Sequence, residues 1–203
     1  MSITERRLRE RAQRHDLIIA AARNLAEAEG WEAVTTRRLA EIVEYSQPVL
    51  YSHFDGKDAI VRAVALEGFA ELAKAMHQAR SGNDSPGLAL RAVCDAYMAF
   101  AAERPAVYHA MFALPIDVPF ASVETPSAPK AAFAALFDVL KPFDEDPIVL
   151  SELVWAALHG LAVLRRGGRI PPEREPARID TLVSQIVRRS GAHVHHQSPG
   201  PNT

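Results

Sequence analysis

Residues 35–57, TTRRLAEIVEYSQPVLYSHFDGK, carry the strongest indication of how this chain folds. The first part predicts a short helix over residues 36–43, because three apolar residues recur at the spacing of one helical face: Leu39, Ile42 and Val43. Thr35 or Thr36 supplies the hydroxyl that caps the first turn. A polar break then precedes a second candidate helix, so the stretch is interpreted as two short helices joined by a tight turn.

The second helix is predicted to begin at Ser46, with Pro48 in its first turn, where the amide hydrogen that proline lacks has no helical acceptor. Leu50 and Phe54 are four residues apart and point to the same side. The opposite side and its flanks carry small, amide and aromatic residues rather than charges: Gln47, Pro48, Val49, Tyr51, Ser52 and His53. Such a surface is unusual for bulk solvent and suits the major groove of DNA.

Two blocks within this stretch resemble the DNA-binding domain of the tetracycline-repressor (TetR/AcrR) family: Thr35-Thr36-Arg37-x-Leu39-Ala40 and Ser46-Gln47-Pro48-x-Leu50-Tyr51-x-His53-Phe54-x-x-Lys57. The upstream run at 18–22 and the pair Gly30-Trp31 fit that family's first helix and its end, so the resemblance covers residues 12–65. It implies an all-α fold whose residues 1–58 form a three-helix bundle with a helix-turn-helix. Residues 59–190 would then form a helical domain for effector binding and dimerisation.

The resemblance and the side-chain chemistry together indicate which residues contact DNA. Thr36, Tyr51, His53 and Lys57 carry hydroxyl, imidazole or ammonium groups suited to backbone phosphates. Gln47 has the amide geometry for adenine, and the methyls of Val49 can touch a thymine methyl. The expected DNA-binding set is Thr35, Thr36, Arg37, Ser46, Gln47, Pro48, Val49, Tyr51, Ser52, His53 and Lys57.

The turn departs from the family pattern, which usually has a glycine where this chain has Val43-Glu44-Tyr45-Ser46. A left-handed residue in the turn would cost Glu44 on the order of 1 kcal/mol relative to glycine. We therefore expect either a strained turn or a turn of another shape, and the angle of the second helix is left open.

Charge is balanced over the 203 residues, with 23 basic and 25 acidic side chains, so DNA binding must come from the distribution of charge. The first fifteen residues concentrate basic charge in five arginines: Arg6, Arg7, Arg9, Arg11 and Arg14. This segment is interpreted either as a contact to phosphates or the minor groove, or as a solvated helix start with i,i+4 ion pairs to Glu5 and Glu10.

Several classes of protein are disfavoured by the sequence. The single cysteine, Cys94, excludes an internal disulfide and a multi-cysteine zinc site and fits a reducing cytosol. No apolar run approaches 18 residues and the N-terminus is too charged for a signal peptide, so we expect a cytoplasmic protein with no membrane segment. His193, His195 and His196 suggest adventitious metal binding rather than a site. Catalytic motifs are absent, and we expect no enzymatic activity, metal or cofactor.

Outside residues 35–57, helical periodicity and turn residues predict further helices and no strands. The predicted helices cover 4–29, 58–80, a segment beginning at 85–86, 105–114, 130–140, 147–166 and 174–189. Residues 115–129 contain four prolines and are predicted to be a surface connection. The segment 191–203 is predicted to be a disordered tail.

The segment Trp155-x-x-x-His159-Gly160-Leu161, followed by Gly167-Gly168-Arg169, resembles a C-terminal domain (WHG-type) found in one branch of this family. That resemblance implies that the last two long helices pair with their copies in a second subunit. The helix over 147–166 is also apolar on more sides than one core face requires. The expected dimer interface is Leu153, Leu158, Gly160, Leu161, Leu182 and Ile186.

Aromatic residues of the middle helices are candidates for lining an effector pocket, although such a stripe is more often ordinary core. The candidate set is Tyr97, Phe100, Tyr108, Phe112, Phe137 and Trp155. An effector that binds them would be a small, partly apolar molecule.

The sequence therefore predicts a homodimeric transcriptional regulator, most consistent with a repressor that binds a palindromic operator in double-stranded DNA and is released by an effector. Two alternatives remain at this point: a DNA-binding regulator controlled by a protein partner, and a helical ligand-binding protein without DNA binding.

Overall fold

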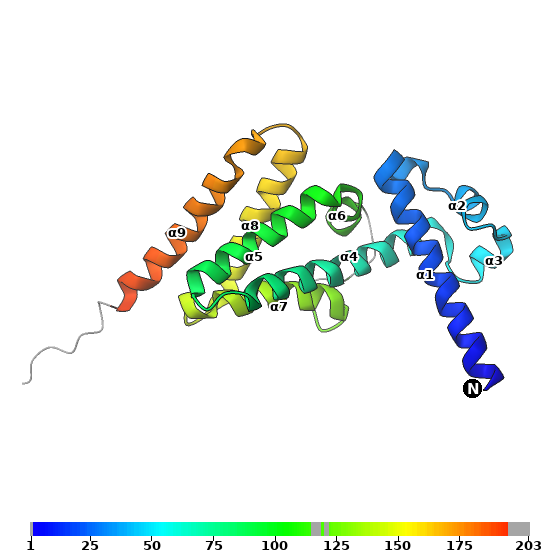
Figure 1. Ribbon diagram of the computed structural model, residues 1–203, viewed down its shortest axis with the longest axis horizontal. Coiled ribbons are helices and arrows are strands. Elements are labelled where there is room, and N and C mark those ends of the chain that lie inside the picture. Colours follow the sequence, from blue (N-terminus) through cyan, green and yellow to red (C-terminus); the bar gives the residue numbers. More distant parts are fainter. Residues whose placement is uncertain (1, 115–118, 120–121, 195–203) are drawn as a thin grey trace, which may run out of the picture. The chain divides into compact units, whose positions relative to one another are not determined.

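The computed structural model describes residues 2–114, 119 and 122–194, and every regular element among them is a helix. The chain forms two compact units. The first comprises Met1–Ala70 and Arg104–Pro129, and the second comprises Glu71–Glu103 and Lys130–Thr203. The all-α prediction is confirmed, and each unit is built from helices (Figure 1).

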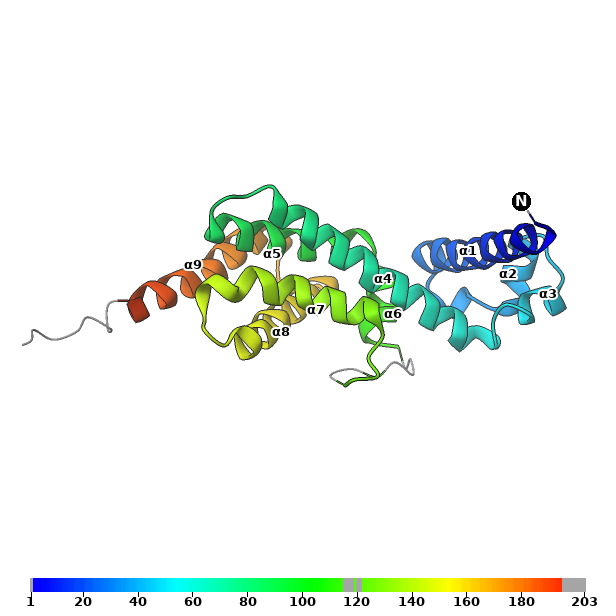
Figure 2. The same ribbon diagram turned by 90° about the horizontal axis from the view of Figure 1, so that it is seen from below.

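The first unit begins with α1 (Ile3–Glu29), which a reciprocal capping box of Ser2 and Glu5 starts and Gly30 ends at φ 85°. A 3-10 turn, η1 (Trp31–Ala33), leads to α2 (Thr36–Ile42) and α3 (Gln47–Tyr51). The first part of α4 (Gly56–Ser81) and all of α6 (Pro105–Phe112) complete the unit. Figure 2 shows α1 lying over α2 and α3.

The core of the first unit forms where the apolar stripes of these helices meet. Helices α1, α2, α4 and α6 and the residues around α3 all contribute side chains that are at most 5 % exposed. Among them are Ile18, Ala22, Leu39, Leu50, Phe54, Ile60, Val64 and Val107. Burial of a large apolar side chain stabilises the unit by about 1.5–3 kcal/mol. These buried side chains therefore anchor the short helices α2 and α3 in the core of the first unit.

Helix α6 belongs to the first unit because α1 and the turn after it hold its first turn. The Glu27 carboxylate accepts hydrogen bonds from the backbone N–H groups of Ala106 (3.0 Å) and Val107 (3.1 Å). The indole N–H of Trp31 donates to the Ala106 carbonyl at 2.8 Å. A carboxylate at a helix start satisfies amides that have no partner inside the helix. The compact units therefore divide within α4 and around α6, and not at the expected boundary between residues 58 and 59.

The second unit contains the rest of α4 with α5 (Pro86–Glu103), α7 (Ser127–Leu140), η2 (Lys141–Phe143), α8 (Pro147–Arg166), η3 (Pro172–Arg174) and α9 (Glu175–Val194). Helix α5 packs against α8 and α9. The core of the second unit is made of side chains from all its long helices: Met76, Leu90, Val93, Leu136, Leu140, Leu158 and Ile179. Arg165 binds both carboxylate oxygens of Glu175 at 2.7 and 2.8 Å, which ties α8 to the start of α9.

The observed elements depart from the expected ones at two places. Helix α7 begins at Ser127, inside the segment expected to be a surface connection, of which residues 115–118 and 120–121 lie outside the described part. Helix α9 continues to Val194, so residues 191–194 are helical where a disordered tail was expected. The remainder of that predicted tail, including His195 and His196, lies outside the described residues. The described residues contain no group of three potential metal ligands.

Candidate nucleic-acid interface

Helix α2 is fixed at its start by two contacts. The Thr35 hydroxyl accepts a hydrogen bond from the Arg38 backbone N–H at 3.2 Å, as expected for its N-cap. The Arg38 guanidinium forms a bidentate pair with Glu29 at the end of α1, at 2.7 and 2.5 Å. The hydrogen bond from Arg38 lowers the pKa of the Glu29 carboxyl. Both contacts orient α2 relative to α1, while Arg37 is exposed and pairs with Glu41 at 3.1 Å.

The turn between α2 and α3 is left-handed at Glu44, whose φ is 56°. The Tyr45 N–H donates to the Ala40 carbonyl at 2.9 Å, and the Glu44 N–H donates to the Glu41 carbonyl at 3.3 Å. These two bonds define the Schellman ending of a helix, in which glycine usually occupies the left-handed position. The expectation of a strained turn is confirmed, and the turn keeps the usual helix-ending shape with glutamate in the glycine position.

Helix α3 is anchored on one side and open on the other. Leu50 is fully buried and Phe54 is 5 % exposed, as their shared direction predicted. Ser46, Gln47 and Pro48 are exposed, Val49 is half-buried, and Tyr51 is 52 % exposed. Ser46 occupies the N-cap position without a side-chain capping bond. The open face therefore offers an amide and apolar groups beside an exposed aromatic ring.

Two of the four residues expected to hold phosphates lie together at the edge of this face. The Thr36 hydroxyl of α2 and the Tyr51 hydroxyl of α3 are 3.4 Å apart, so the two helices bring them together. Lys57 is placed differently, because its ammonium donates to the Trp31 carbonyl at 2.7 Å and is partly buried. The Ser52 hydroxyl donates to the Val49 carbonyl at 2.6 Å. Lys57 and Ser52 thus take part in the fold of the unit itself.

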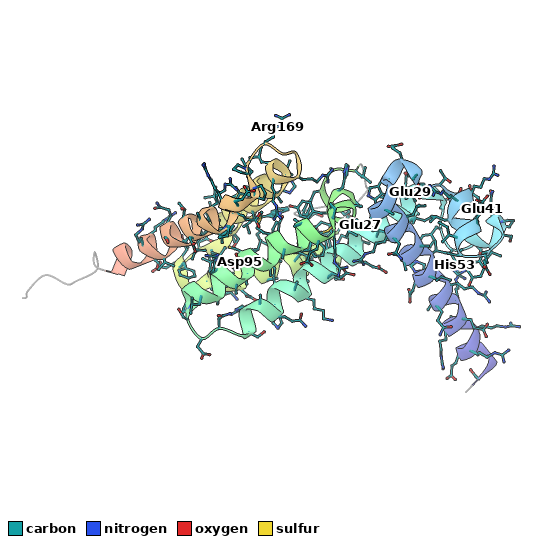
Figure 3. All side chains as sticks on the ribbon, turned by 45° about the horizontal axis from the view of Figure 1, so that its top comes forward. Glu27, Glu29, Glu41, His53, Asp95 and Arg169 are labelled. Atoms are coloured by element: carbon teal, nitrogen blue, oxygen red, sulfur yellow. The ribbon has the colours of Figure 1, made fainter. Side chains whose placement is uncertain are left out.

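His53 lies between α3 and α1 (Figure 3). Its Nδ1 atom is buried and has no hydrogen-bond partner among the described residues. Burial lowers the pKa of its imidazole, and the neighbouring charges of Arg11, His15 and Arg14 lower it further. The sequence did not predict that His53 lies against α1, because the periodicity of one helix does not show which distant residues its side chains contact.

The expected dimer residues divide between the surface and the core of the second unit. Leu153 is 59 % exposed, and Gly160, Leu161 and Leu182 are partly exposed. Leu158 is fully buried and Ile186 is 7 % exposed, so within one subunit neither side chain is open to a partner. Leu158 and Ile186 lie on the apolar side of α8 and α9 that packs into the core of the second unit. Helical periodicity in the sequence does not distinguish this buried side from the outer apolar side.

Helix α8 has a second apolar face that the described chain leaves open. Its exposed or partly exposed residues recur at i, i+4, i+7, i+11 and i+14: Val149, Leu153, Ala156, Gly160 and Val163. A side chain added at Gly160 would meet nothing within 4 Å in this chain. By length and composition α8 could also cross a membrane, and only a third of its most apolar window is buried.

The six aromatic residues expected to bind an effector do not share one unit. Tyr108 and Phe112 lie in the first unit, where their rings are 4.8 Å apart and Phe112 also meets Phe69. Tyr97 and Phe100 are buried in the core of the second unit. Phe137 and Trp155 are partly exposed in that unit, and the Trp155 ring meets the Phe133 ring edge-on at 6.3 Å. His159 follows Trp155 by one helical turn, and burial lowers the pKa of its imidazole.

Comparisons with known proteins agree with this architecture. Residues 18–64 match the model for bacterial regulatory proteins of the tetR family, and residues 90–189 match the model for the tetracyclin repressor-like C-terminal domain. An uncharacterised HTH-type transcriptional regulator of Mycobacterium tuberculosis is 26 % identical over 156 residues, which cover 74 % of this chain and 69 % of that protein.

Two solved structures show the same fold. A protein of unknown function from Rhodococcus sp. RHA1 has a TM-score of 0.72 at 22 % identity, with 84 % of this chain and 94 % of that one covered. A single-residue variant of TetR from Acinetobacter baumannii AYE, in complex with minocycline, has a TM-score of 0.58 at 19 % identity, with 90 % and 97 % covered.

Proposed function

This chain belongs to the tetR family of bacterial regulatory proteins and is a DNA-binding transcriptional regulator, and we propose that it acts as a repressor released by a small molecule. In this proposal a homodimer binds a palindromic operator. Its two α3 helices enter successive major grooves roughly 34–36 Å apart.

The observation that carries the proposal is the open face of α3. Leu50 and Phe54 hold the helix in the core, so Gln47 and Val49 face outward on a rigid base. Gln47 is suited to the N6 and N7 atoms of adenine, and Val49 to a thymine methyl. Thr36 and Tyr51, whose hydroxyls lie together beside this face, are suited to a backbone phosphate.

Homodimer formation is supported by the second apolar face of α8. A contiguous apolar stripe on an otherwise folded unit is typical of a surface that a partner covers. Small residues at its centre, Ala156 and Gly160, allow a second helix to approach closely. A self-complementary contact along this face would place two DNA-binding units in one assembly.

Release by an effector is supported by the partly exposed aromatic residues of the second unit. Phe137, Trp155 and His159 combine apolar rings with polar groups, which fits a partly apolar small molecule. The TetR protein from Acinetobacter baumannii is in complex with minocycline. An effector would act by binding the DNA-incompetent conformation more tightly, and a hundredfold preference supplies about 2.7 kcal/mol.

The test of the proposal is a selection of duplexes from a random library, followed by affinity measurements with the selected site. We expect an inverted repeat with half-site centres one helical turn apart. Gln47→Ala should weaken binding to that site by about 1–3 kcal/mol and relax preference at one position of each half-site. Gln78→Ala, which removes an exposed amide from α4, is the matched control and should bind as the wild type does. Unchanged sequence preference in the Gln47 variant would contradict the role given to α3.

Effector release is tested by titrating the protein–operator complex with a compound shown to bind the free protein. Because coupling is reciprocal, operator and compound should weaken each other's binding by the same factor. Simultaneous binding with unchanged affinities would exclude the repressor-release model and leave the DNA-binding role intact.

A further inference from the structure

Helix α1 extends well beyond the core of its unit, and its extension is basic on one side. In the C-terminal half of the helix, the face that carries Ile18 is buried, and Ala22 and Leu25 lie on the same face. A step of about 100° per residue places Arg7, Arg11 and Arg14 within roughly 40° of the same direction. The stripe that packs into the core therefore continues, toward the N-terminus, as a line of three exposed arginines, here called the basic stripe.

The basic stripe runs past the end of α3. The Arg11 guanidinium donates to the backbone carbonyl of Ser52, the residue that ends α3, at 3.2 Å. One residue beyond Arg14, the His15 ring stacks on Phe54 with 4.5 Å between ring centroids. Arg11 and Arg14 are also close enough to His53 to lower the pKa of its imidazole. These contacts place the stripe on the side of α1 that faces α3. Figure 1 shows the N-terminal part of α1 continuing past α3.

The charge of the basic stripe is not neutralised by neighbouring carboxylates. Glu10 pairs with Arg6 at 3.5 Å, and Glu5 is used by the capping box at the start of the helix. Among the described residues, neither Arg7 nor Arg14 has an ion-pair partner. Three cations therefore lie in a line over seven residues, or roughly 10 Å of helix. One strand of duplex DNA carries a phosphate for about every 3.4 Å of its axis, so three phosphates fit that length.

We propose that Arg7, Arg11 and Arg14 form a second DNA-contacting surface, which holds the phosphate backbone on the outer flank of the half-site read by α3. The proposal rests on the DNA-binding role proposed above and extends the footprint of each subunit. Arginine suits this role because its planar guanidinium can bind two oxygens of one phosphate. The contact carries no base information, so it strengthens binding to any flanking sequence.

The basic stripe predicts a specific salt dependence. Each phosphate contact contributes about 0.9 to the magnitude of the slope of log K against log salt concentration. Arg7→Gln combined with Arg14→Gln removes four contacts from a dimer, so the slope should fall by about 3.6. Arg11 is left in place because it also holds the end of α3. Arg9→Gln is the matched control, since this arginine lies about 180° from Ile18 on the same helix.

The experiment uses the full-length protein and the duplex selected by the wild type, in two lengths. One duplex ends at the outer edge of each half-site, and the other extends about one helical turn of ~10 bp further on both sides. Affinity is measured by fluorescence anisotropy over a range of salt concentrations. We expect the double variant to lose affinity and slope on the long duplex, and to match the wild type on the short one. Arg9→Gln should match the wild type on both, and far-UV circular dichroism should show unchanged helix content in every variant.

Four outcomes would overturn the inference. Equal slopes for wild type and double variant on the long duplex would exclude the flanking contact while leaving the proposed function intact. Equal losses for Arg9→Gln and the double variant would mean that general charge, and not the basic stripe, is responsible. Binding of the wild type to anionic lipid vesicles, with no effect of duplex length, would assign the arginines to a membrane surface. A wild type that selects no duplex would overturn the proposed function and this inference together.

Discussion

Among single residues, Glu44 is the position where the backbone imposes a cost on the helix-turn-helix. Its φ of 56° lies in the region that glycine enters freely and a residue with a Cβ enters at a cost of about 1 kcal/mol. Schellman bonds from Glu44 and Tyr45 hold the chain there despite that cost. The turn therefore has the hydrogen bonds of a helix ending in which glycine is usual, with glutamate in the left-handed position.

Replacing Glu44 by glycine should stabilise the first unit without moving α3. We expect Glu44→Gly to raise the free energy of unfolding by up to about 1 kcal/mol, a gain partly offset by the greater freedom of glycine in the unfolded chain. Glu44→Asn should fall near the wild type, and Glu44→Val should lose stability, since a β-branched residue is strained at positive φ. Urea unfolding of the three variants measures the order. A Gly variant less stable than the wild type would contradict the strain assigned to this turn.

The imidazole of His53 should make folding sensitive to acid. Burial, assisted by Arg11, His15 and Arg14, lowers its pKa in the folded state below the usual 6.5. The unfolded chain therefore binds a proton first as pH falls, so this residue destabilises the fold progressively below about pH 6.5. Above that pH both states carry a neutral ring and the effect is absent. His53→Gln should show a shallower loss of stability than the wild type between about pH 7 and pH 5 in urea unfolding; parallel curves would exclude this linkage.

At the level of secondary structure elements, the docking of α6 on α1 and α4 decides which residues form the first unit. Glu27 and Trp31 hold its first turn, and Gly68 of α4 allows its side to approach closely. A Cβ at Gly68 would lie 2.6 Å from the Val107 Cγ1 atom and 2.7 Å from the Met111 Sδ atom. The position of helix α6 therefore depends on the Glu27 carboxylate, the Trp31 indole and the lack of a side chain at Gly68.

Gly68→Ala should destabilise the protein although alanine is the better helix former. The helix preference for alanine is worth about 1 kcal/mol, whereas overpacking against α6 costs about 1–3 kcal/mol, so we expect a net loss of up to about 2 kcal/mol. Gly87→Ala is the matched control, because its Cβ would meet Val187 at an ordinary 3.5 Å. Thermal unfolding of both variants provides the comparison. Equal effects of the two substitutions would show that α6 does not pack on Gly68 in solution.

Loss of the Glu27 carboxylate should loosen α6 specifically. Glu27→Ala leaves the Ala106 and Val107 amides without their acceptor, and we expect a cost of about 1–3 kcal/mol. Hydrogen exchange at those two amides should accelerate more than exchange in α2. Glu27→Gln keeps one acceptor oxygen and should fall between the wild type and the alanine variant. Unchanged protection of both amides in Glu27→Ala would refute the capping role.

For the molecule as a whole, the two apolar faces of α8 have different roles: one packs in the core of the second unit, and the other is the proposed dimer interface. Leu158 points into the core of the second unit, and Leu153, little more than one turn away, is 59 % exposed. Leu153→Glu should therefore leave the subunit folded and break the proposed dimer. Two buried leucines per symmetric dimer are worth about 3–6 kcal/mol, or roughly a hundredfold or more in the dissociation constant. Leu158→Glu should unfold the second unit instead.

Sedimentation equilibrium and circular dichroism of the same samples distinguish these outcomes. We expect the wild type to sediment as a dimer at micromolar concentration and Leu153→Glu as a folded monomer. A folded wild-type monomer at that concentration would refute the dimer, and a dimeric Leu153→Glu would move the interface away from this face of α8.

Features that depend on neighbours along the chain could be predicted from the amino-acid sequence. The positions of α2 and α3, the directions of Leu50 and Phe54, the cap at Thr35 and the strain at Glu44 all follow from helical spacing, capping chemistry and backbone sterics. These effects act over one or two turns, so a local pattern contains the information needed to predict them.

Which helix faces meet could be read only from the folded chain. Contacts between residues about 80 positions apart assign α6 to α1, and the Lys57 ammonium is held by the Trp31 carbonyl. Leu158 rather than Leu153 lies on the core side of α8, and Arg11 is aimed at the end of α3. When a helix is apolar on two sides, its sequence is compatible with burying either side in its own subunit. The choice is made by the shapes and charges of distant segments, which come together only when the chain folds.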